Sequence, residues 1–304
     1  MNMTTRWFAA ALLGSAVVAV GFPASASAAD KSLTWVGCGI SKKAFMAELA
    51  SAYETKTGIK IVLEGGGATK GIRQVSARSV ELGGSCRHTI DSGTSLSPVT
   101  EERRVIMTPV AWDALVVIVH KDNPVSDISM DQLRAVFEGR LTNWKELGGN
   151  DAPLELYVRK GNISGVGRTL RELVFANYDK EFVATHVVKS SGPLEKGVEE
   201  NPNGFGVTGV SSARKRDAKI LSLNGKAPNF ENIKNGGYLL YRPLYLVTHL
   251  QNEDPAVKQF VDFAFSEDGK KIIRSVGTVP YEDAIPLWLT YLDQQQKAVA
   301  AGLY

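Results

Sequence analysis

The sequence predicts an α/β fold with a parallel, doubly wound sheet. Strand-like segments, glycine-rich loops and helix-like segments follow one another several times along the chain, beginning with KSLTWV (31–36) and a helix-like segment at 42–57. ALVVIV (114–119) is almost wholly apolar, as expected of a strand that is buried on both faces. Strands that alternate with helices build parallel sheets, and such sheets bind ligands beyond the carboxyl ends of their strands.

The limits of the individual elements come from apolar periodicity and from capping residues. Ser41 is the expected N-cap of the helix at 42–57, and Gly58 is expected to end it. A strand follows at 59–64, and a short helix is expected at 72–80. Later elements are expected as helices at 130–139, 168–178 and 255–266 and as a strand within 238–249.

The first 29 residues predict a signal peptide. The basic segment MNMTTR precedes the apolar WFAAALLGSAVVAVGF, and small residues follow in ASASAA. No later segment approaches the ~18 consecutive apolar residues that a membrane-spanning helix requires. We therefore expect a soluble protein that is exported to the periplasm.

The overall composition is that of a globular protein, with 44% hydrophobic and 22% charged residues. A formal net charge of +3 gives no reason to expect nucleic acid or anionic lipid as a partner. The basic cluster SARKRDAK, around Arg214 to Lys219, is interpreted as solvated surface.

Three glycine-rich loops indicate an anion site. They lie at 37–41, 65–71 and 161–167, each before a helix-like segment, and Arg159 precedes the last. Helix N-termini present unpaired N–H groups and the positive end of the helix dipole, both of which favour an anion. A guanidinium is the preferred side chain for a tetrahedral oxyanion.

The order of several motifs resembles the phosphate-binding proteins of ABC phosphate importers. The resemblance covers nearly the whole mature chain, and it is most specific in DALVVIVHKDNPV and TNWKELGG. The remaining matching segments are GGGATKGI, VELGGSCR, VRKGNISGVGRTL, NPNGFGVTGV, YRPLYLVTH and SEDGKKIIRSVGTVP.

This resemblance implies a two-lobed type II periplasmic binding protein, each lobe with a doubly wound, mostly parallel sheet. Lobe 1 would comprise residues 30–112 and 245–304, and lobe 2 residues 113–244, with crossing strands near 112–119 and 241–248. The ligand would be clamped between the lobes by hinge closure. The expected protein is a monomer without cofactor or enzymatic activity, which delivers a phosphate-like oxyanion to an ABC permease or a membrane sensor.

The resemblance also implies which residues contact the oxyanion. By motif they are Ile40, Ser41, Ala68, Thr69, Cys86, Arg159, Ser164, Gly165 and Val166, with support from Arg87. Four features depart from the family pattern: Ala68 replaces a serine, Val166 replaces a threonine, Cys86 stands where an aspartate or serine is usual, and one extra residue precedes Ser164. A thiol is a weak acceptor for the proton of hydrogen phosphate, so Glu64 and Glu81 are candidate replacements for the missing carboxylate.

The two cysteines, Cys38 and Cys86, allow three interpretations. An even number of cysteines in an exported protein favours a disulfide. Two thiolates with His88 are also suited to arsenite or to a soft metal such as copper or zinc, which gives the alternative function of a receptor for a thiol-reactive ligand. A catalytic cysteine with His88 or His120 as its base is the third interpretation.

Overall fold

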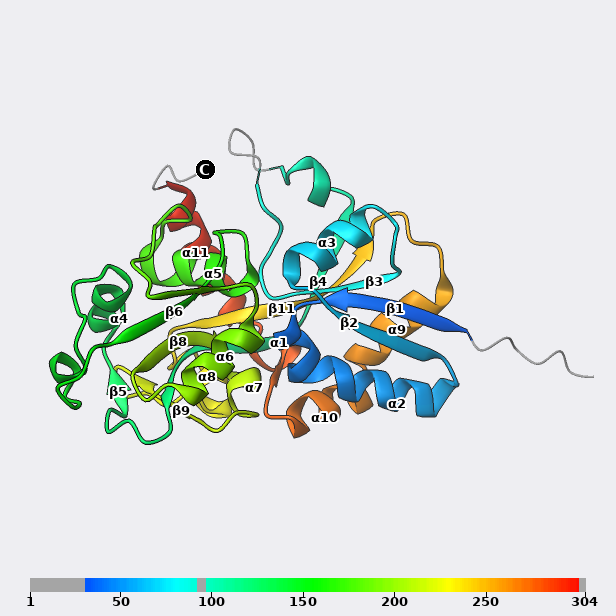
Figure 1. The fold of residues 1–304 in the computed structure, drawn as a ribbon. Coiled ribbons are helices and arrows are strands. Elements are labelled where there is room, and N and C mark those ends of the chain that lie inside the picture. Colours follow the sequence, from blue (N-terminus) through cyan, green and yellow to red (C-terminus); the bar gives the residue numbers. More distant parts are fainter. Residues whose placement is uncertain (1–30, 92–96, 301–304) are drawn as a thin grey trace, which may run out of the picture.

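The computed structural model describes residues 31–91 and 97–300 and consists of one main sheet covered by helices (Figure 1). The predicted signal peptide, residues 1–29, lies outside the described residues. The strands of the main sheet are β1 (Ser32–Gly37), β2 (Lys60–Gly65), β3 (Leu82–Ser85), β4 (Val105–His120), β6 (Glu155–Arg159), β7 (His186–Val188), β8 (Gly204–Gly209), β9 (Ala218–Ile220), β11 (Tyr241–His249) and β12 (Val279–Pro280). They follow the order β2-β1-β3-β11-β4-β8-β6-β7, with β9 and β12 paired to β4, and β5 (Asp127–Ile128) pairs separately with β10 (Ser222–Leu223).

Two parallel sets of strands are joined by two long antiparallel strands. β1 is parallel to β2 and β3, and β6 is parallel to β7 and β8, while β4 and β11 lie between the sets and are antiparallel to each other. The resulting α/β architecture confirms the predicted fold class. β4 contains the apolar run that we expected as a buried strand, and its residues from Val110 to Val119 are all buried.

The carboxyl ends of both parallel sets meet at the middle of β4. The end of β3, Ser85, lies opposite Tyr245, which in turn pairs with Pro109 of β4. The end of β8, Gly209, lies opposite Leu115 of β4. The loops that leave β3 and β8 therefore emerge close to each other, although they belong to different parallel sets.

Helices cover both faces of the sheet. In Figure 1, α3 lies on one face of β1 and β3, and α2, α9 and α10 lie on the other. The α-helices are α1 (Gly39–Ser41), α2 (Ala47–Thr57), α3 (Ala68–Ser76), α4 (Met130–Phe137), α5 (Gly165–Leu170), α6 (Ser191–Glu200), α7 (Val210–Ala213), α8 (Phe230–Lys234), α9 (Pro255–Phe265), α10 (Glu267–Ser275) and α11 (Leu287–Ala300). Of the described helices, none combines the length and apolarity needed to cross a membrane.

Shorter helical turns complete the structure. Two are π-helical, η1 (Lys42–Met46) and η4 (Arg171–Phe175), and three are 3-10 turns, η2 (Thr100–Glu102), η3 (Trp144–Leu147) and η5 (Tyr281–Ala284). The π-helical turns extend α1 and α5, so each of these short helices continues into a longer helical segment.

Ser41 is not the N-cap that we expected. Cys38 occupies that position, with an extended backbone (φ −64°, ψ 126°), whereas Ser41 is already helical (φ −58°, ψ −38°). The Ser41 hydroxyl is buried and donates to the carbonyl of Ser85 at 3.4 Å, so it makes a tertiary contact instead of a cap. The helical segment that begins at Gly39 ends at Gly58 (φ 74°), as predicted.

The short helix expected at 72–80 begins and ends earlier than predicted. It runs from Ala68 to Ser76, because Gly67 (φ 90°) turns the chain directly into the helix. At the other end Arg78 has a left-handed conformation (φ 57°), which no helix continues through. The earlier start brings the first turn of α3 into the second glycine loop.

A buried ion pair connects β4 with β11. Arg242 and Asp113 are both fully buried, and their Nη2 and Oδ2 atoms are 3.4 Å apart. Nη1 of Arg242 also donates to the carbonyls of Cys86 (3.1 Å) and Gly165 (3.4 Å). Asp113 accepts a further hydrogen bond from the Ser211 hydroxyl at 2.7 Å. One guanidinium thus holds together two central strands and two loops.

We expect Arg242→Met to lower the free energy of unfolding by about 3–5 kcal/mol, because it leaves Asp113 buried without its counter-charge. Urea unfolding followed by circular dichroism measures this. The matched variant Arg242→Met/Asp113→Leu removes both charges and should lose less stability than the single variant. Equal stability of Arg242→Met and the wild type would contradict the assigned role.

Candidate functional site

A cavity of about 490 Å³ lies where the loops of the two parallel sets meet. Its walls come from the carboxyl ends of β1, β2, β3 and β6 and from the starts of α3, α5 and α6. The lining residues are Cys38, Gly39, Lys43, Gly65, Gly66, Gly67, Ala68, Cys86, Arg159, Gly165, Val166, Lys189, Ser190, Ser191, Gly192, Ser212 and Arg216. This is the position at which doubly wound α/β folds bind ligands.

Half of the residues predicted to contact an oxyanion line this cavity. They are Ala68, Cys86, Arg159, Gly165 and Val166. A Cβ atom placed on Gly165 would lie 3.3 Å from the Cβ of Ala68 and would overlap the sulfur of Cys86. Two loops from different parallel sets are therefore in direct contact at the base of the cavity, and this close approach requires glycine.

The other predicted residues are close by but are engaged elsewhere. Ile40 is fully buried, and Ser41 bonds to the β3 strand end. The Thr69 hydroxyl donates to the carbonyl of Ile163 at 3.0 Å. The Ser164 hydroxyl caps α5 by accepting from the N–H of Gly167 at 3.1 Å. These side chains fix the geometry of the loops and do not line the cavity.

Arg87 belongs to a buried ion pair with Glu102. Its Nη1 and Nη2 atoms contact the two carboxylate oxygens at 2.9 and 2.8 Å, and both side chains are fully buried. Nη2 also donates to the hydroxyl of Thr69 at 3.0 Å. Burial by itself raises the pKa of Glu102, but the hydrogen bonds and charge of Arg87 outweigh it, so that the pKa is lowered overall. Arg87 thereby anchors the third loop to the protein interior.

Arg159 is one of two arginines that line the cavity, with Arg216. Its Nη1 donates to the Ser191 hydroxyl at 2.7 Å and its Nη2 to the carbonyl of Lys189 at 3.3 Å. Within residues 31–91 and 97–300 it makes no ion pair. Burial lowers its pKa, an effect that the charge of Glu195 opposes and that of Arg242 reinforces. A bound anion would relieve the cost of this partial burial.

The buried carboxylate of Glu195 binds two further cationic side chains that line the cavity. It contacts Lys43 at 3.2 Å and Arg216 at 3.0 Å, and it accepts from the hydroxyls of Ser212 and Thr208 at 2.5 and 2.7 Å. Burial opposes ionisation of Glu195, but the hydroxyl donors and Lys43 lower its pKa overall. Lys43 comes from η1, which follows β1, and Glu195 from α6, which follows β7. This ion pair therefore joins elements that belong to the two different parallel sets of strands.

The sequence did not lead us to expect this group of charged residues at the cavity. Arg216 lies in the basic cluster that we interpreted as solvated surface, and that interpretation is wrong for this residue, since it lines the cavity and is bound to Glu195. The proposed carboxylate replacements also fail. Glu64 is exposed and lies 3.8 Å from Lys70, and Glu81 accepts from the N–H of Thr34. Neither lines the cavity.

Cys38 and Cys86 form a disulfide, with 6.3 Å between their Cα atoms. Neither described cysteine is therefore a free thiol. His88 instead faces Glu172 at 3.3 Å and Tyr178 at 3.4 Å. The described residues contain no His, Cys, Asp and Glu group suited to a metal ion. Of the three interpretations of the cysteines, the structure contains the disulfide.

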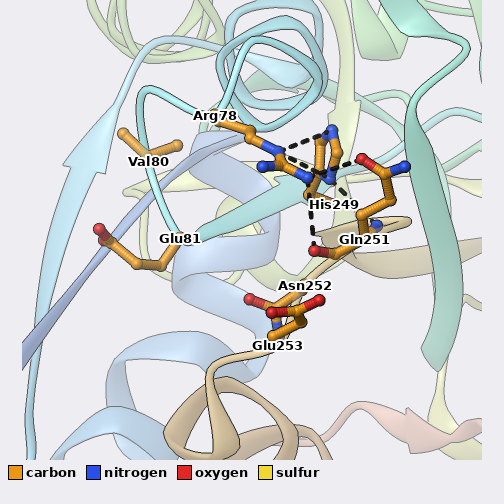
Figure 2. A pocket seen from close by; sticks show the side chains of 7 residues that line it. All are labelled: Arg78, Val80, Glu81, His249, Gln251, Asn252 and Glu253. Carbon is orange, nitrogen blue, oxygen red and sulfur yellow. Dashed lines mark hydrogen bonds between the residues drawn. The ribbon is translucent and has the colours of Figure 1, made fainter.

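A second cavity, of about 310 Å³, lies at the opposite end of β3 (Figure 2). Figure 2 shows Arg78, His249 and Gln251 pointing toward one another. Arg78 donates to the His249 ring at 3.3 Å and to Gln251 at 2.7 Å. Burial lowers the pKa of His249, and the charges of Arg78 and Arg104 add to this effect. Arg78 is already bonded to His249 and Gln251 here, whereas Arg159 has no carboxylate partner among the described residues, so we assign the binding site to the first cavity.

The model of the PBP superfamily domain matches residues 24–268. The chain belongs to this superfamily. The phosphate-binding protein PstS of Bacillus subtilis is 27% identical over 84% of this chain and 82% of its own length. PstS of Borreliella burgdorferi is 30% identical over 56% of this chain, and the match spans 64% of that relative. These matches confirm the resemblance that the motifs indicated.

Solved structures of this superfamily agree with the fold. A putative phosphate ABC transporter substrate-binding protein with bound phosphate, from Clostridium perfringens, has a TM-score of 0.74 at 27% identity. The match covers 82% of this chain and 99% of that one. An ABC-type phosphate transport receptor from Vibrio cholerae has a TM-score of 0.61 at 25% identity, covering 82% of this chain and 100% of that one.

The disulfide should contribute strongly to stability. Its cysteines are separated by 48 residues, and closing a loop of that length stabilises the folded state by about 4 kcal/mol in the chain-entropy model. We expect Cys38→Ser/Cys86→Ser to lower the free energy of unfolding by this amount. A reductant should destabilise the wild type similarly and leave the double variant unchanged. Two titratable thiols in freshly purified, denatured protein would refute the pairing.

The Arg87–Glu102 pair predicts acid sensitivity. Because the pKa of Glu102 is lower in the folded than in the unfolded protein, its contribution to stability is complete above 4.5, the ordinary pKa of glutamate, and is lost as the pH falls through the lowered pKa. The melting temperature of the wild type should therefore decrease as the pH is lowered below about 4.5. The melting temperature of Glu102→Gln should be lower at neutral pH and should decrease less steeply with falling pH. The same slope in both proteins would assign the acid sensitivity to other carboxylates.

Proposed function

We propose that this protein is an exported solute receptor that holds a small, phosphate-like oxyanion between two lobes. The observation that carries the proposal is Arg159, a guanidinium without a carboxylate partner among the described residues, at a cavity bounded by loops of both parallel sets. Relatives and structural neighbours of this chain are named as phosphate-binding proteins, which supports an oxyanion as the ligand.

Recognition would combine Arg159 with main-chain donors. The first turn of α3 begins at Ala68 on the cavity wall, and first-turn N–H groups of a helix have no intrahelical acceptor. Glycines at 65–67 and 165 let a ligand approach the backbone closely. In this proposal Thr69, Arg87 and Ser164 hold the loops in place, and the cavity-lining residues contact the ligand.

We propose the lobe limits that follow from the family resemblance, with residues 30–112 and 245–304 in lobe 1 and residues 113–244 in lobe 2. The register of β11 against β4 shifts between Leu244 and Tyr245, which coincides with one proposed limit. An irregular pairing at this point suits a hinge, because it absorbs backbone rotation that a regular ladder resists. Closure would exclude water and strengthen each ionic contact.

The cellular role follows from the same proposal. A monomeric receptor in the periplasm would pass its ligand to an ABC permease or to a membrane sensor. Its activity is binding and release, without a chemical step. The thiol-reactive alternative is not favoured, because it needs free thiolates at Cys38 and Cys86, which the structure joins as a disulfide.

Arg159→Met should weaken oxyanion binding by about 10- to 100-fold, since a hydrogen bond to a charged group contributes roughly 1.5–3 kcal/mol. Isothermal titration calorimetry with inorganic phosphate, arsenate and sulfate measures this. The control is Arg140→Met, an exposed arginine that pairs with Glu138 and does not line the cavity. Equal affinities of the Arg159 variant and the wild type would refute the proposed site.

A further inference from the structure

We infer that Lys43 is a positioning residue, which keeps the two lobes closed over the ligand by binding Glu195. This inference rests on the proposed function and concerns how the same site is held closed. Lys43 belongs to the proposed lobe 1 and Glu195 to the proposed lobe 2, so their ion pair crosses from one lobe to the other. Lys43 lines the cavity, but its charge serves this pair and not the ligand.

The ammonium group of Lys43 is largely committed to lobe 2. Its Nζ lies 3.2 Å from Oε2 of Glu195 and donates to the Ser212 hydroxyl at 2.8 Å. A lysine ammonium has three donors, so these two contacts leave one. The Ser212 hydroxyl in turn donates to Oε1 of Glu195 at 2.5 Å. The three side chains therefore form a closed set of hydrogen bonds across the boundary between the lobes.

The main chain around Lys43 also contacts lobe 2. Nζ of Lys215 donates to the carbonyl of Lys43 at 3.1 Å. A Cβ atom placed on Gly209, at the end of β8, would lie 2.5 Å from Cγ2 of Ile40 in α1. This approach is closer than any residue except glycine allows. The turn that carries Lys43 is thus held against lobe 2 by packing, by a main-chain hydrogen bond and by the ion pair.

Opening of the lobes would break the Lys43–Glu195 pair. Glu195 is fully buried, and a buried carboxylate that loses a cationic partner raises the free energy of the protein. In the open state Glu195 would keep the contact with Arg216, which lies in the same lobe, but would lose Lys43. The pair therefore favours the closed state. Since the apparent affinity of a ligand is proportional to the populated fraction of the state that binds it, the pair also raises affinity.

The variant Glu195→Gln separates this role from direct contact with the ligand. If Lys43 bound the anion itself, removing the negative charge beside it would release Lys43 and Arg216 toward the ligand and strengthen binding. If Lys43 holds the lobes together, the same change weakens the closed state and therefore weakens binding. Glutamine has the size of glutamate and keeps an oxygen that accepts hydrogen bonds, so the Ser212 hydroxyl retains an acceptor.

The first test is calorimetric titration of inorganic phosphate into the wild type, Lys43→Met, Glu195→Gln and the double variant. Both single variants should bind about tenfold more weakly, as a tenfold lower closed fraction requires. The double variant should bind no more weakly than Lys43→Met, because both changes remove one interaction. The control Asp262→Asn removes a carboxylate from the exposed pair with Lys258 and should bind like the wild type. Unchanged or tighter binding by Glu195→Gln would overturn the inference and leave the proposed function intact.

The second test is small-angle X-ray scattering, which measures closure directly. Without ligand, Lys43→Met and Glu195→Gln should have a larger radius of gyration than the wild type, and saturating phosphate should restore the wild-type value. Lys43→Arg keeps the ion pair and should resemble the wild type in both tests. Equal radii of gyration for the ligand-free wild type and Lys43→Met would refute the role of Lys43.

The scattering comparison also keeps the two proposals apart. If the wild type binds no oxyanion, the proposed function fails, and the ligand-free radii of gyration still decide whether the Lys43–Glu195 pair holds the lobes together. If Glu195→Gln does not fold, Lys43→Met and Lys43→Arg decide the question, because the Lys43 side chain is partly exposed and its replacement leaves no large buried gap.

Discussion

The buried guanidinium of Arg242 is the constraint on which the cavity depends. It draws inward the carbonyls of Cys86 and Gly165, which belong to loops from the two different parallel sets. Because the C=O and N–H of a trans peptide point in opposite directions, turning the Gly165 carbonyl toward Arg242 turns the N–H of Val166 away from it. The buried charge thus orients the main chain of a cavity that it does not itself line.

The charged residues around the cavity are of two kinds: buried ion pairs behind it, and Arg159 on its surface. Asp113 and Glu195 are both fully buried, and each accepts hydrogen bonds from hydroxyl groups as well as from a cation. Their partners Arg242, Lys43 and Arg216 are therefore held in place and partly neutralised. Arg159 is held in place by the Ser191 hydroxyl and the Lys189 carbonyl, but it has no carboxylate partner among the described residues, so its charge is not neutralised at the cavity.

The fold and part of the site could be predicted from the sequence because they depend on local patterns. Alternating strands and helices indicated the α/β class, and Arg159 was identified because it precedes a glycine loop. The role of Arg87 could not be predicted, since its partner Glu102 lies on a separate turn. Lys43 and Arg216 belong to segments that look solvated, and only the packing of α1 against α6 and of η1 against α7 brings them to Glu195.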